Sequence, residues 1–384
     1  MSVSAADAGV GTAALPEGGR IDFAGLRESR RRRLFDAMSA AGLDVLLLGR
    51  AANIQFASGA RQLWTAGLRP FGPGCIVVAG TGRVHLLSTW DEGVPDEIRH
   101  DDLFGLTWNP ANLVTRVGAV PGLHGARRVG TDGVGPGTDQ LLAALAPEAE
   151  LVDANPVLRT ARSVKTAEEV ACIRTAAALA EAALTAMSAS VAPGITEREL
   201  VGVHSGRLAE LGAPIPAWEA VACATPRHGP VRRRRLTSDR PVAAGELVAL
   251  TACALYAGYE ADVSRTVVCP GGGGPGDLLD RVATAQAGLI DACRPGATGA
   301  DLVSAWGATG WSDPSDPGPE PLAWGVGLGM EPPVIGSGLG AMERLEEGMT
   351  LAVQAWLAED GVGGALRADV LLVTAGGPEV LTRA

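Results

Sequence analysis

The 384-residue sequence predicts two domains, a smaller α/β domain followed by a larger α+β domain. In the N-terminal part, one helical segment is followed by short apolar runs that are typical of buried strands. In the C-terminal part, long helical segments alternate with strand pairs joined by tight turns, which indicates antiparallel hairpins covered by helices. We expect residues 1–25 to form a flexible N-terminal tail, residues 26–158 the smaller domain and residues 162–384 the larger domain.

The smaller domain is predicted from a helix and a hairpin. Residues 26–42 carry apolar side chains at helical spacing and end at a glycine, a common helix stop. Residues 44–49 form an apolar run that predicts a buried strand. Two further apolar runs, residues 75–79 and 84–88, flank a glycine-rich turn and predict a β-hairpin.

The larger domain begins at a capping box. Thr166 and Glu169 have the spacing at which each side chain bonds the other residue's backbone N–H, and Thr196 and Glu199 repeat it. They predict two consecutive helices, and a third helix is expected at residues 277–293. Four apolar runs between and after these helices predict strands, at residues 246–255, 259–268, 350–357 and 365–374.

Composition narrows the classes of function. The net charge is −11, and no segment has the basic excess that a nucleic-acid partner requires. No apolar run looks long enough to span a membrane, and the N-terminal residues lack the basic-then-apolar order of a signal peptide. The six cysteines are widely spaced and predict buried free thiols in the cytoplasm, with neither a disulfide framework nor a zinc site.

Several motifs stand in a recognisable order along the chain. They are the runs at residues 162–174 and 191–200, the strand turn at residues 258–266, Gly325-x-Gly327 before Glu331, and residues 347–350. In this order they resemble the creatinase, prolidase and aminopeptidase P family, M24. The resemblance implies a pita-bread fold for the C-terminal domain, a creatinase-type N-terminal domain and a homodimer.

The resemblance also implies a site for two divalent metal ions, held by five carboxylate or imidazole side chains. At the matching positions this chain has one carboxylate and four residues that are poor ligands for a dication. No histidine follows residue 228, so no shift of the alignment supplies an imidazole there. We therefore predict no metal and no other cofactor, and we expect one cleft to bring together Thr251, Asp262, Trp324, Gln354 and Ala368.

His228 is the predicted acid/base. Residues 225–230 resemble the loop on which the family keeps a substrate-side histidine, and creatinases, which lack the metals, are expected to transfer a proton with it. A neutral imidazole can take and return a proton near pH 7. Asp262 is the second predicted catalytic residue, near the substrate, water or Arg265. The alternatives are a loop histidine without a role and an Asp262 paired with an arginine.

Five residues are predicted to contact the substrate, namely Glu331, Trp324, Gln354, Arg265 and Thr251. Three of them, Glu331, Trp324 and Arg265, have a structural alternative. Arg265 also fits a buried support pair with Asp369, and Glu331 a turn cap. The tryptophans at positions 218, 324 and 356 line an apolar pocket or pack in the core.

The predicted function is a metal-independent, creatinase-like hydrolase or lyase. Its substrate would be a small molecule or short peptide, with a C–N or related bond in an amino acid, amidino acid or amide. One alternative is an inactive pseudopeptidase that binds a ligand or peptide. The other is an Xaa-Pro dipeptidase or aminopeptidase with an atypical metal site. Fold resemblance does not decide among these functions.

Overall fold

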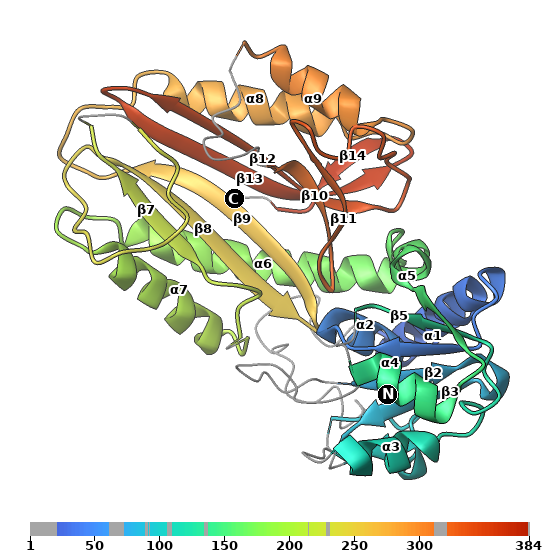
Figure 1. The fold of residues 1–384 in the computed structure, drawn as a ribbon. Helices are drawn as coiled ribbons and strands as arrows, with labels where there is room; N and C mark the ends of the chain where they lie inside the picture. The colour runs from blue at the N-terminus through green and yellow to red at the C-terminus, as the bar shows by residue number, and fades with distance from the viewer. Residues whose placement is uncertain are drawn as a thin grey trace. The chain divides into compact units, whose positions relative to one another are not determined.

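The computed structural model describes residues 21–60, 73–88, 91, 93–105, 110–133, 137–213, 215–227, 231–310 and 321–382 (Figure 1). These residues form two compact units, whose main parts are Asp22–Arg162 and Ser163–Ala384. The predicted N-terminal tail lies, up to residue 20, outside the described residues.

The first unit is an α/β domain around a mixed six-stranded sheet, in the order β4-β3-β2-β1-β5-β6. Its central strand, β1, pairs antiparallel with β2 and parallel with β5. The predicted hairpin is present, because β2 pairs antiparallel with β3. The strands are β1 (Val45–Leu48), β2 (Cys75–Val78), β3 (Arg83–Leu87), β4 (Leu103–Phe104), β5 (Arg128–Thr131) and β6 (Glu150–Asp153), and the helices are α1 (Phe23–Ala40), α2 (Ala51–Ser58), α3 (Pro110–Gly118), α4 (Gly137–Leu145) and α5 (Asn155–Arg162).

The second unit is built on an antiparallel sheet in the order β11-β10-β12-β13-β9-β8-β7, with β14 paired to β13. The predicted strand pairs are present as β8 with β9 and β12 with β13. The strands are β7 (Val221–Thr225), β8 (Leu247–Tyr256), β9 (Tyr259–Val268), β10 (Pro321–Gly327), β11 (Gly329–Gly336), β12 (Thr350–Glu359), β13 (Gly363–Thr374) and β14 (Gly377–Val380), and the helices are α6 (Ala167–Ala189), α7 (Glu197–Glu210), α8 (Leu278–Ala292) and α9 (Gly299–Gly307).

Both predicted capping boxes are present at the starts of α6 and α7. The Thr166 hydroxyl accepts a hydrogen bond from the Glu169 N–H at 3.3 Å, and the Glu169 carboxylate accepts one from the Thr166 N–H at 2.9 Å. Thr196 and Glu199 repeat this exchange at 3.2 and 2.8 Å. These bonds satisfy N–H groups that have no partner within a helix, and they fix where each helix begins.

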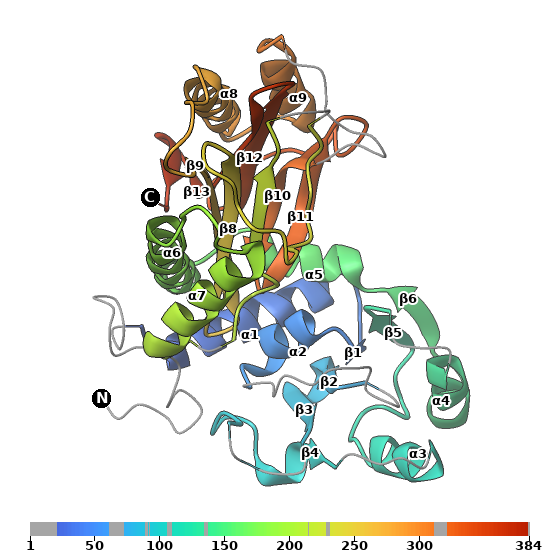
Figure 2. The same cartoon turned by 90° about the vertical axis from the view of Figure 1, so that its left-hand side faces the viewer.

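The helices of the second unit cover one face of its sheet (Figures 1 and 2). The α6 helix contacts β8 and β9, and α8 contacts β12 and β13. Tyr259 points toward α6 and donates a hydrogen bond of 2.7 Å to Glu169, while alternate residues of β12, such as Val353, belong to the core beneath α8. Since side chains alternate across a sheet, the residues between these positions face the other side.

The α6 helix is long and apolar enough to cross a membrane, judged by length and composition alone. The prediction that no segment reaches such a length is therefore wrong by that measure. However, 56% of its apolar window is buried inside the protein. It contacts β8 and β9, so its apolar composition is explained by its place in the core. As predicted, all six cysteines are free and buried.

Candidate functional site

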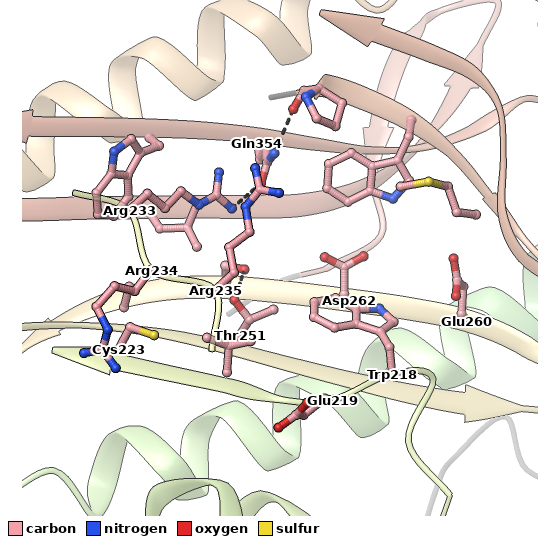
Figure 3. Close-up of a pocket in the computed structure, with 18 of the residues that line it drawn as sticks. Trp218, Glu219, Cys223, Arg233, Arg234, Arg235, Thr251, Glu260, Asp262 and Gln354 are labelled. Carbon is pink, nitrogen blue, oxygen red and sulfur yellow. Dashed lines mark hydrogen bonds between the residues drawn. The ribbon is translucent and has the colours of Figure 1, made fainter. Parts of the chain in front are cut away.

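A cavity of about 550 Å³ lies in the second unit, on the sheet face opposite the helices (Figure 3). Side chains from β7 to β13 line it, together with loop residues that include Trp218 and Arg233–Arg235. Its volume is within the usual range of small-molecule sites. It is therefore the candidate functional site of this unit.

Strand register explains why residues far apart in sequence meet here. Thr251 on β8 lies opposite Ser264 on β9, Ser264 lies opposite Ala368 on β13, and Ala368 lies opposite Gln354 on β12. Asp262 is two residues before Ser264 and therefore faces the same side. The cavity lining includes Thr251, Asp262, Trp324 and Gln354, and Ala368 is the register partner of Gln354. The structure thus brings the five predicted cleft positions together.

The side chains in this row do not fit two divalent metal ions. Thr251 and Ser264 share a hydrogen bond of 2.8 Å between their hydroxyl groups. The Gln354 side-chain oxygen accepts a hydrogen bond from the Arg233 guanidinium at 2.9 Å, so a fixed cation already contacts this position. No group of three or more His, Cys, Asp or Glu side chains suited to a metal ion occurs among the described residues. A dinuclear site requires several converging anionic or imidazole ligands.

Asp262 is the carboxylate in this row. It is 4% exposed, and burial, with a smaller effect of the negative charge of Asp369, raises its pKa from 3.8 to about 7. Within the described part of the chain its carboxylate forms no ion pair. A carboxyl group with this pKa exists in both protonation states near neutral pH and can therefore exchange a proton.

The predicted contact between Asp262 and Arg265 is not present, because Arg265 contacts other groups. Its guanidinium donates hydrogen bonds to Asp369 Oδ1 at 2.6 Å and to the Ala368 carbonyl at 2.9 Å. The alternative support pair of Arg265 with Asp369 is therefore confirmed. Arg265 does not line the cavity, and its contact with a substrate stays a prediction.

Glu331 is also placed away from the cavity lining. Its carboxylate forms an ion pair with Lys165, and both side chains are buried. Gly327 makes room for this carboxylate, since a Cβ there would lie 2.7 Å from Glu331 Oε1. A buried carboxylate is costly without a cationic partner, and this requirement explains why Glu331 turns toward Lys165. The predicted contact of Glu331 with a substrate stays a prediction.

The predicted acid/base His228 lies outside the described residues. The described part of its loop ends at Arg227, which donates a hydrogen bond of 2.8 Å to the Gly273 carbonyl. Thr225, at the start of the same motif, is buried and accepts a hydrogen bond of 3.0 Å from the Gly364 N–H. The role of His228 remains a prediction.

Sequence reasoning missed Arg233. Its guanidinium bonds Gln354 and lies over the Trp356 ring, 5.9 Å from the ring centroid. Burial, with the nearby positive charge of Arg235, lowers its pKa to about 10. The neighbouring Arg234 is held by Glu197 through two hydrogen bonds of 2.7 Å. Four consecutive arginines at residues 232–235 in an acidic chain were the available signal.

Two family models match the chain. The model described as metallopeptidase family M24 matches residues 171–375, and the creatinase/prolidase N-terminal domain matches residues 30–164. The chain belongs to metallopeptidase family M24. It carries the creatinase/prolidase N-terminal domain together with the M24 domain, in the order that the sequence motifs predict.

Relatives in this M24 family agree with the fold. The Xaa-Pro dipeptidase of Pyrococcus horikoshii is 23% identical over 377 residues, covering 92% of this chain and 96% of that protein. The Xaa-Pro dipeptidase of Pyrococcus furiosus is 28% identical over 239 residues, and this match spans 65% of its length. The prolidase structure from P. horikoshii OT3 superposes with a TM-score of 0.76 at 21% identity, covering 92% of this chain and 98% of that chain.

These matches confirm the predicted pita-bread fold with its N-terminal domain. They do not support the finer prediction that the chain is most like creatinase, because both curated relatives named above are Xaa-Pro dipeptidases. The family is a family of metallopeptidases, whereas the row of Thr251, Asp262, Ala368 and Gln354 lacks the ligands for a dinuclear centre.

Proposed function

We propose that this M24 protein hydrolyses a C–N bond in a small amino-acid or amidino-acid derivative or short peptide, without a dinuclear metal centre. The observation that supports this most directly is the position of Asp262. It is a buried carboxylate at the wall of a small-molecule cavity, in a row that otherwise holds a hydroxyl pair, an alanine and a glutamine. Asp262 would act as the acid/base.

The proposed step needs only water and the substrate. The Asp262 carboxylate takes a proton from water, and the water oxygen forms a bond to the carbon of the scissile C–N bond. As the C–N bond breaks, the proton passes from Asp262 to the leaving nitrogen, which restores the carboxylate. The pKa of about 7 suits both half-steps near neutral pH. His228 is the second candidate for this proton transfer.

The relatives give a reason to include dipeptides among the substrates. They are named Xaa-Pro dipeptidases, and a ligand of dipeptide size suits a cavity of about 550 Å³. The names of these relatives also support one alternative function, an Xaa-Pro dipeptidase with an atypical metal site. An inactive, ligand-binding pseudopeptidase is favoured by a different observation, namely that the Gln354 amide is held by Arg233 and the Thr251 hydroxyl by Ser264.

One assay separates the three functions. The protein would be purified in Mn²⁺ or Co²⁺, analysed for metal, and assayed with Xaa-Pro dipeptides, amidino acids and small amides before and after EDTA. We expect well below one equivalent of metal and turnover that EDTA leaves unchanged. A stoichiometric metal with EDTA-sensitive turnover would establish the atypical metallopeptidase. Binding without turnover across the panel would establish the pseudopeptidase.

Substitutions assign the acid/base. Asp262→Asn should abolish turnover, whereas Asp239→Asn, which removes an exposed carboxylate paired with Arg198 at 2.7 Å, should not. His228→Ala separates the two candidates for proton transfer. Loss of turnover with an unchanged melting temperature would assign the transfer to His228, and full turnover would leave it with Asp262.

We also propose that the protein forms a homodimer, as the family resemblance implies. Light scattering across micromolar concentrations should give twice the mass of 39.1 kDa. A constant mass of one chain would contradict this proposal and leave the proposed chemistry untouched.

A further inference from the structure

The opening of the cavity is marked by the lining residues that solvent also reaches. Of the described residues that line it, Trp218, Glu219, Arg235 and Met330 are exposed. Trp218 and Met330 are the apolar members of this set, and they are 39% and 59% exposed. Trp218 lies in the loop before β7 and Met330 lies on β11, so they come from opposite edges of the sheet. The opening therefore has an apolar side chain on each side.

Trp218 lies beside Asp262. Cys253 on β8 is the register partner of Asp262 on β9. The Cys253 Sγ donates a hydrogen bond of 2.9 Å to the Trp218 backbone carbonyl, so Trp218 and Asp262 are both neighbours of Cys253. Figure 3 shows Trp218 and Asp262 at the same end of the cavity. A group that approaches Asp262 from the opening therefore passes the Trp218 indole.

Cys253 is itself fixed, and it holds Trp218 through a neutral thiol. The pairing of β7 with β8 ends at Val221 and Thr251. Beyond this point, His204 on α7 takes the place of a strand, and the Cys253 backbone N–H donates a hydrogen bond of 3.3 Å to His204 Nε2. Burial raises the pKa of the Cys253 thiol to about 12, so the thiol keeps its proton at neutral pH and can donate to Trp218.

Met330, on the other side of the opening, is held by its neighbour in the chain. Glu331 follows it on β11, and the Glu331 carboxylate forms a buried ion pair with Lys165. Such a pair is costly to break, because either charge would be left buried alone, and it fixes this part of β11. Both sides of the opening are thus attached to buried polar contacts, which gives the opening a defined width.

We propose that Trp218 determines which ligands the cavity accepts, because together with Met330 it limits the width of the group that can reach Asp262. Cys253 is a positioning residue in this arrangement, since it holds the Trp218 backbone and does not line the cavity. The group that enters is slender, and wide substituents on the reacting nitrogen are excluded. The inference rests on the proposed function only in taking Asp262 as the group that a ligand must reach.

Cys223 allows the opening to be measured without a substrate. It is buried, and it is the cysteine among the described residues that lines the cavity, so a thiol reagent must enter the cavity to reach it. The full chain would be treated with methyl methanethiosulfonate and with a wide, dansyl-bearing methanethiosulfonate, and Cys223 labelling would be followed by peptide mass spectrometry. Burial raises the pKa of the Cys223 thiol to about 11, and the ratio of wide to narrow labelling rates cancels this slow reactivity.

Trp218→Ala should raise this ratio by about 10- to 100-fold, the discrimination typical of a steric mismatch, and Met330→Ala should raise it in the same direction. Ile215→Ala is the matched control, because Ile215 is an exposed apolar residue of the same loop that does not line the cavity. Equal entry of both reagents into the wild type, or an unchanged ratio in Trp218→Ala, would overturn the role of Trp218. No labelling of Cys223 by the narrow reagent in the folded wild type would overturn the opening itself.

Two variants of Cys253 test how Trp218 is positioned. Cys253→Ala removes the donor to the Trp218 carbonyl and should raise the labelling ratio toward that of Trp218→Ala. Cys253→Ser keeps a donor at this position and should restore the wild-type ratio. Melting temperatures would be measured alongside, since a purely structural role would lower the melting temperature of Cys253→Ala and leave the ratio unchanged. Equal ratios in the two variants would overturn the positioning role of the thiol.

The outcomes separate this inference from the proposed function. If Trp218→Ala raises the labelling ratio but no member of the substrate panel is turned over, the width limit holds and the hydrolase proposal fails. If turnover is found, Trp218→Ala should lower KM for N-benzyl amides relative to N-methyl amides. An unchanged preference between these amides, together with an unchanged labelling ratio, would leave the hydrolase proposal standing and overturn the width limit.

Discussion

Two aspartates on neighbouring strands of the second unit have opposite environments. Asp369 on β13 and Asp262 on β9 are both buried, at 2% and 4% exposure. Asp369 accepts hydrogen bonds of 2.6 Å from both the Arg265 guanidinium and the Thr382 hydroxyl. Asp262 faces the cavity and forms no ion pair with any described residue. The two aspartates are thus buried to a similar extent, but Asp369 belongs to a structural ion pair, whereas Asp262 can exchange a proton.

Other buried carboxylates of the unit resemble Asp369. Glu197, which is 0% exposed, accepts hydrogen bonds from Arg234, from the Ser238 hydroxyl and from the Ala224 N–H. Glu331 is paired with Lys165. A buried carboxylate in a protein usually has a cationic or hydrogen-bonding partner. Among these four acids, Asp262 is the one without an ion pair, which suggests a role other than stabilising the fold.

The largest effect is expected from breaking the Asp369 pair. Arg265→Met leaves the buried Asp369 charge without its main partner and should lower the free energy of unfolding by about 3–5 kcal/mol. Urea unfolding at pH 7 measures this loss. Arg207→Met is the control, since Arg207 and Glu210 form an exposed pair at 2.8 Å and such pairs contribute little. Equal losses in the two variants would show that the Asp369 pair is not specially stabilising.

Asp262→Asn should act in the opposite direction and raise the stability, by an amount that depends on pH. The folded-state pKa of about 7 is above the ordinary value of 3.8, so the folded carboxyl holds its proton while the unfolded one releases it. The resulting destabilisation is absent below about pH 4, grows as pH rises and is complete above about pH 7. At pH 8 the variant should therefore be more stable than the wild type, by at most about 4 kcal/mol.

Unfolding curves of Asp262→Asn and wild type across pH 4–8 provide the measurement. The two proteins should converge near pH 4 and separate as the pH rises. A variant that is less stable at every pH would show that Asp262 is held by a stabilising contact, as the sequence-based pairing with Arg265 implied. The contrast with Asp369 would then disappear.

Sequence reasoning succeeded where the signal is local or tied to a motif. The capping boxes at Thr166 and Thr196 and the hairpin strands follow from spacing within a few residues. The cleft positions, such as Thr251 and Gln354, followed from the family resemblance. Arg233 was missed because its meeting with Gln354, 121 residues later in the chain, depends on the path of a loop over the sheet. Periodicity and motif spacing carry no information about such a path.

The positions of Glu331 and Arg265 outside the cavity lining were not foreseen, for a related reason. Their positions in sequence motifs were predicted correctly, but the direction of each side chain depends on a distant partner. Glu331 turns to Lys165, 166 residues earlier, and Arg265 turns to Asp369, 104 residues later. Buried charges select their nearest available counter-charge, and a single sequence shows which charges exist without showing which pairs form.

Gly364→Ala tests the packing of the Trp356 ring at the cavity wall, with a smaller expected effect. The added Cβ would lie 2.1 Å from the Trp356 ring, so the indole must move from beneath Arg233. We expect a loss of about 1–3 kcal/mol in stability, measured by urea unfolding. Gly376→Ala is the matched control, because the nearest atom to its added Cβ is Thr374 Oγ1 at 3.8 Å. Equal stability of the two variants would show that the Trp356 ring moves without cost.

The smallest effect is expected at the hydroxyl pair between the two regions. Ser264 is two residues along β9 from Asp262 and lies directly opposite Ala368. Ser264→Ala removes its 2.8 Å hydrogen bond to the Thr251 hydroxyl. Both hydroxyls face the cavity, so water can replace the lost partner, and the stability should fall by only about 0.5–1 kcal/mol. The two neutral hydroxyls form a hydrogen bond with each other, and neither carries a charge that would stabilise the Asp262 carboxylate. The pH above which the stability of Ser264→Ala falls no further, near the Asp262 pKa of about 7, should therefore match that of the wild type. A shift of that upper limit toward pH 4 or beyond pH 8 would mean that Ser264 changes the pKa of Asp262, and Asp262 would then resemble the buried acids that have partners.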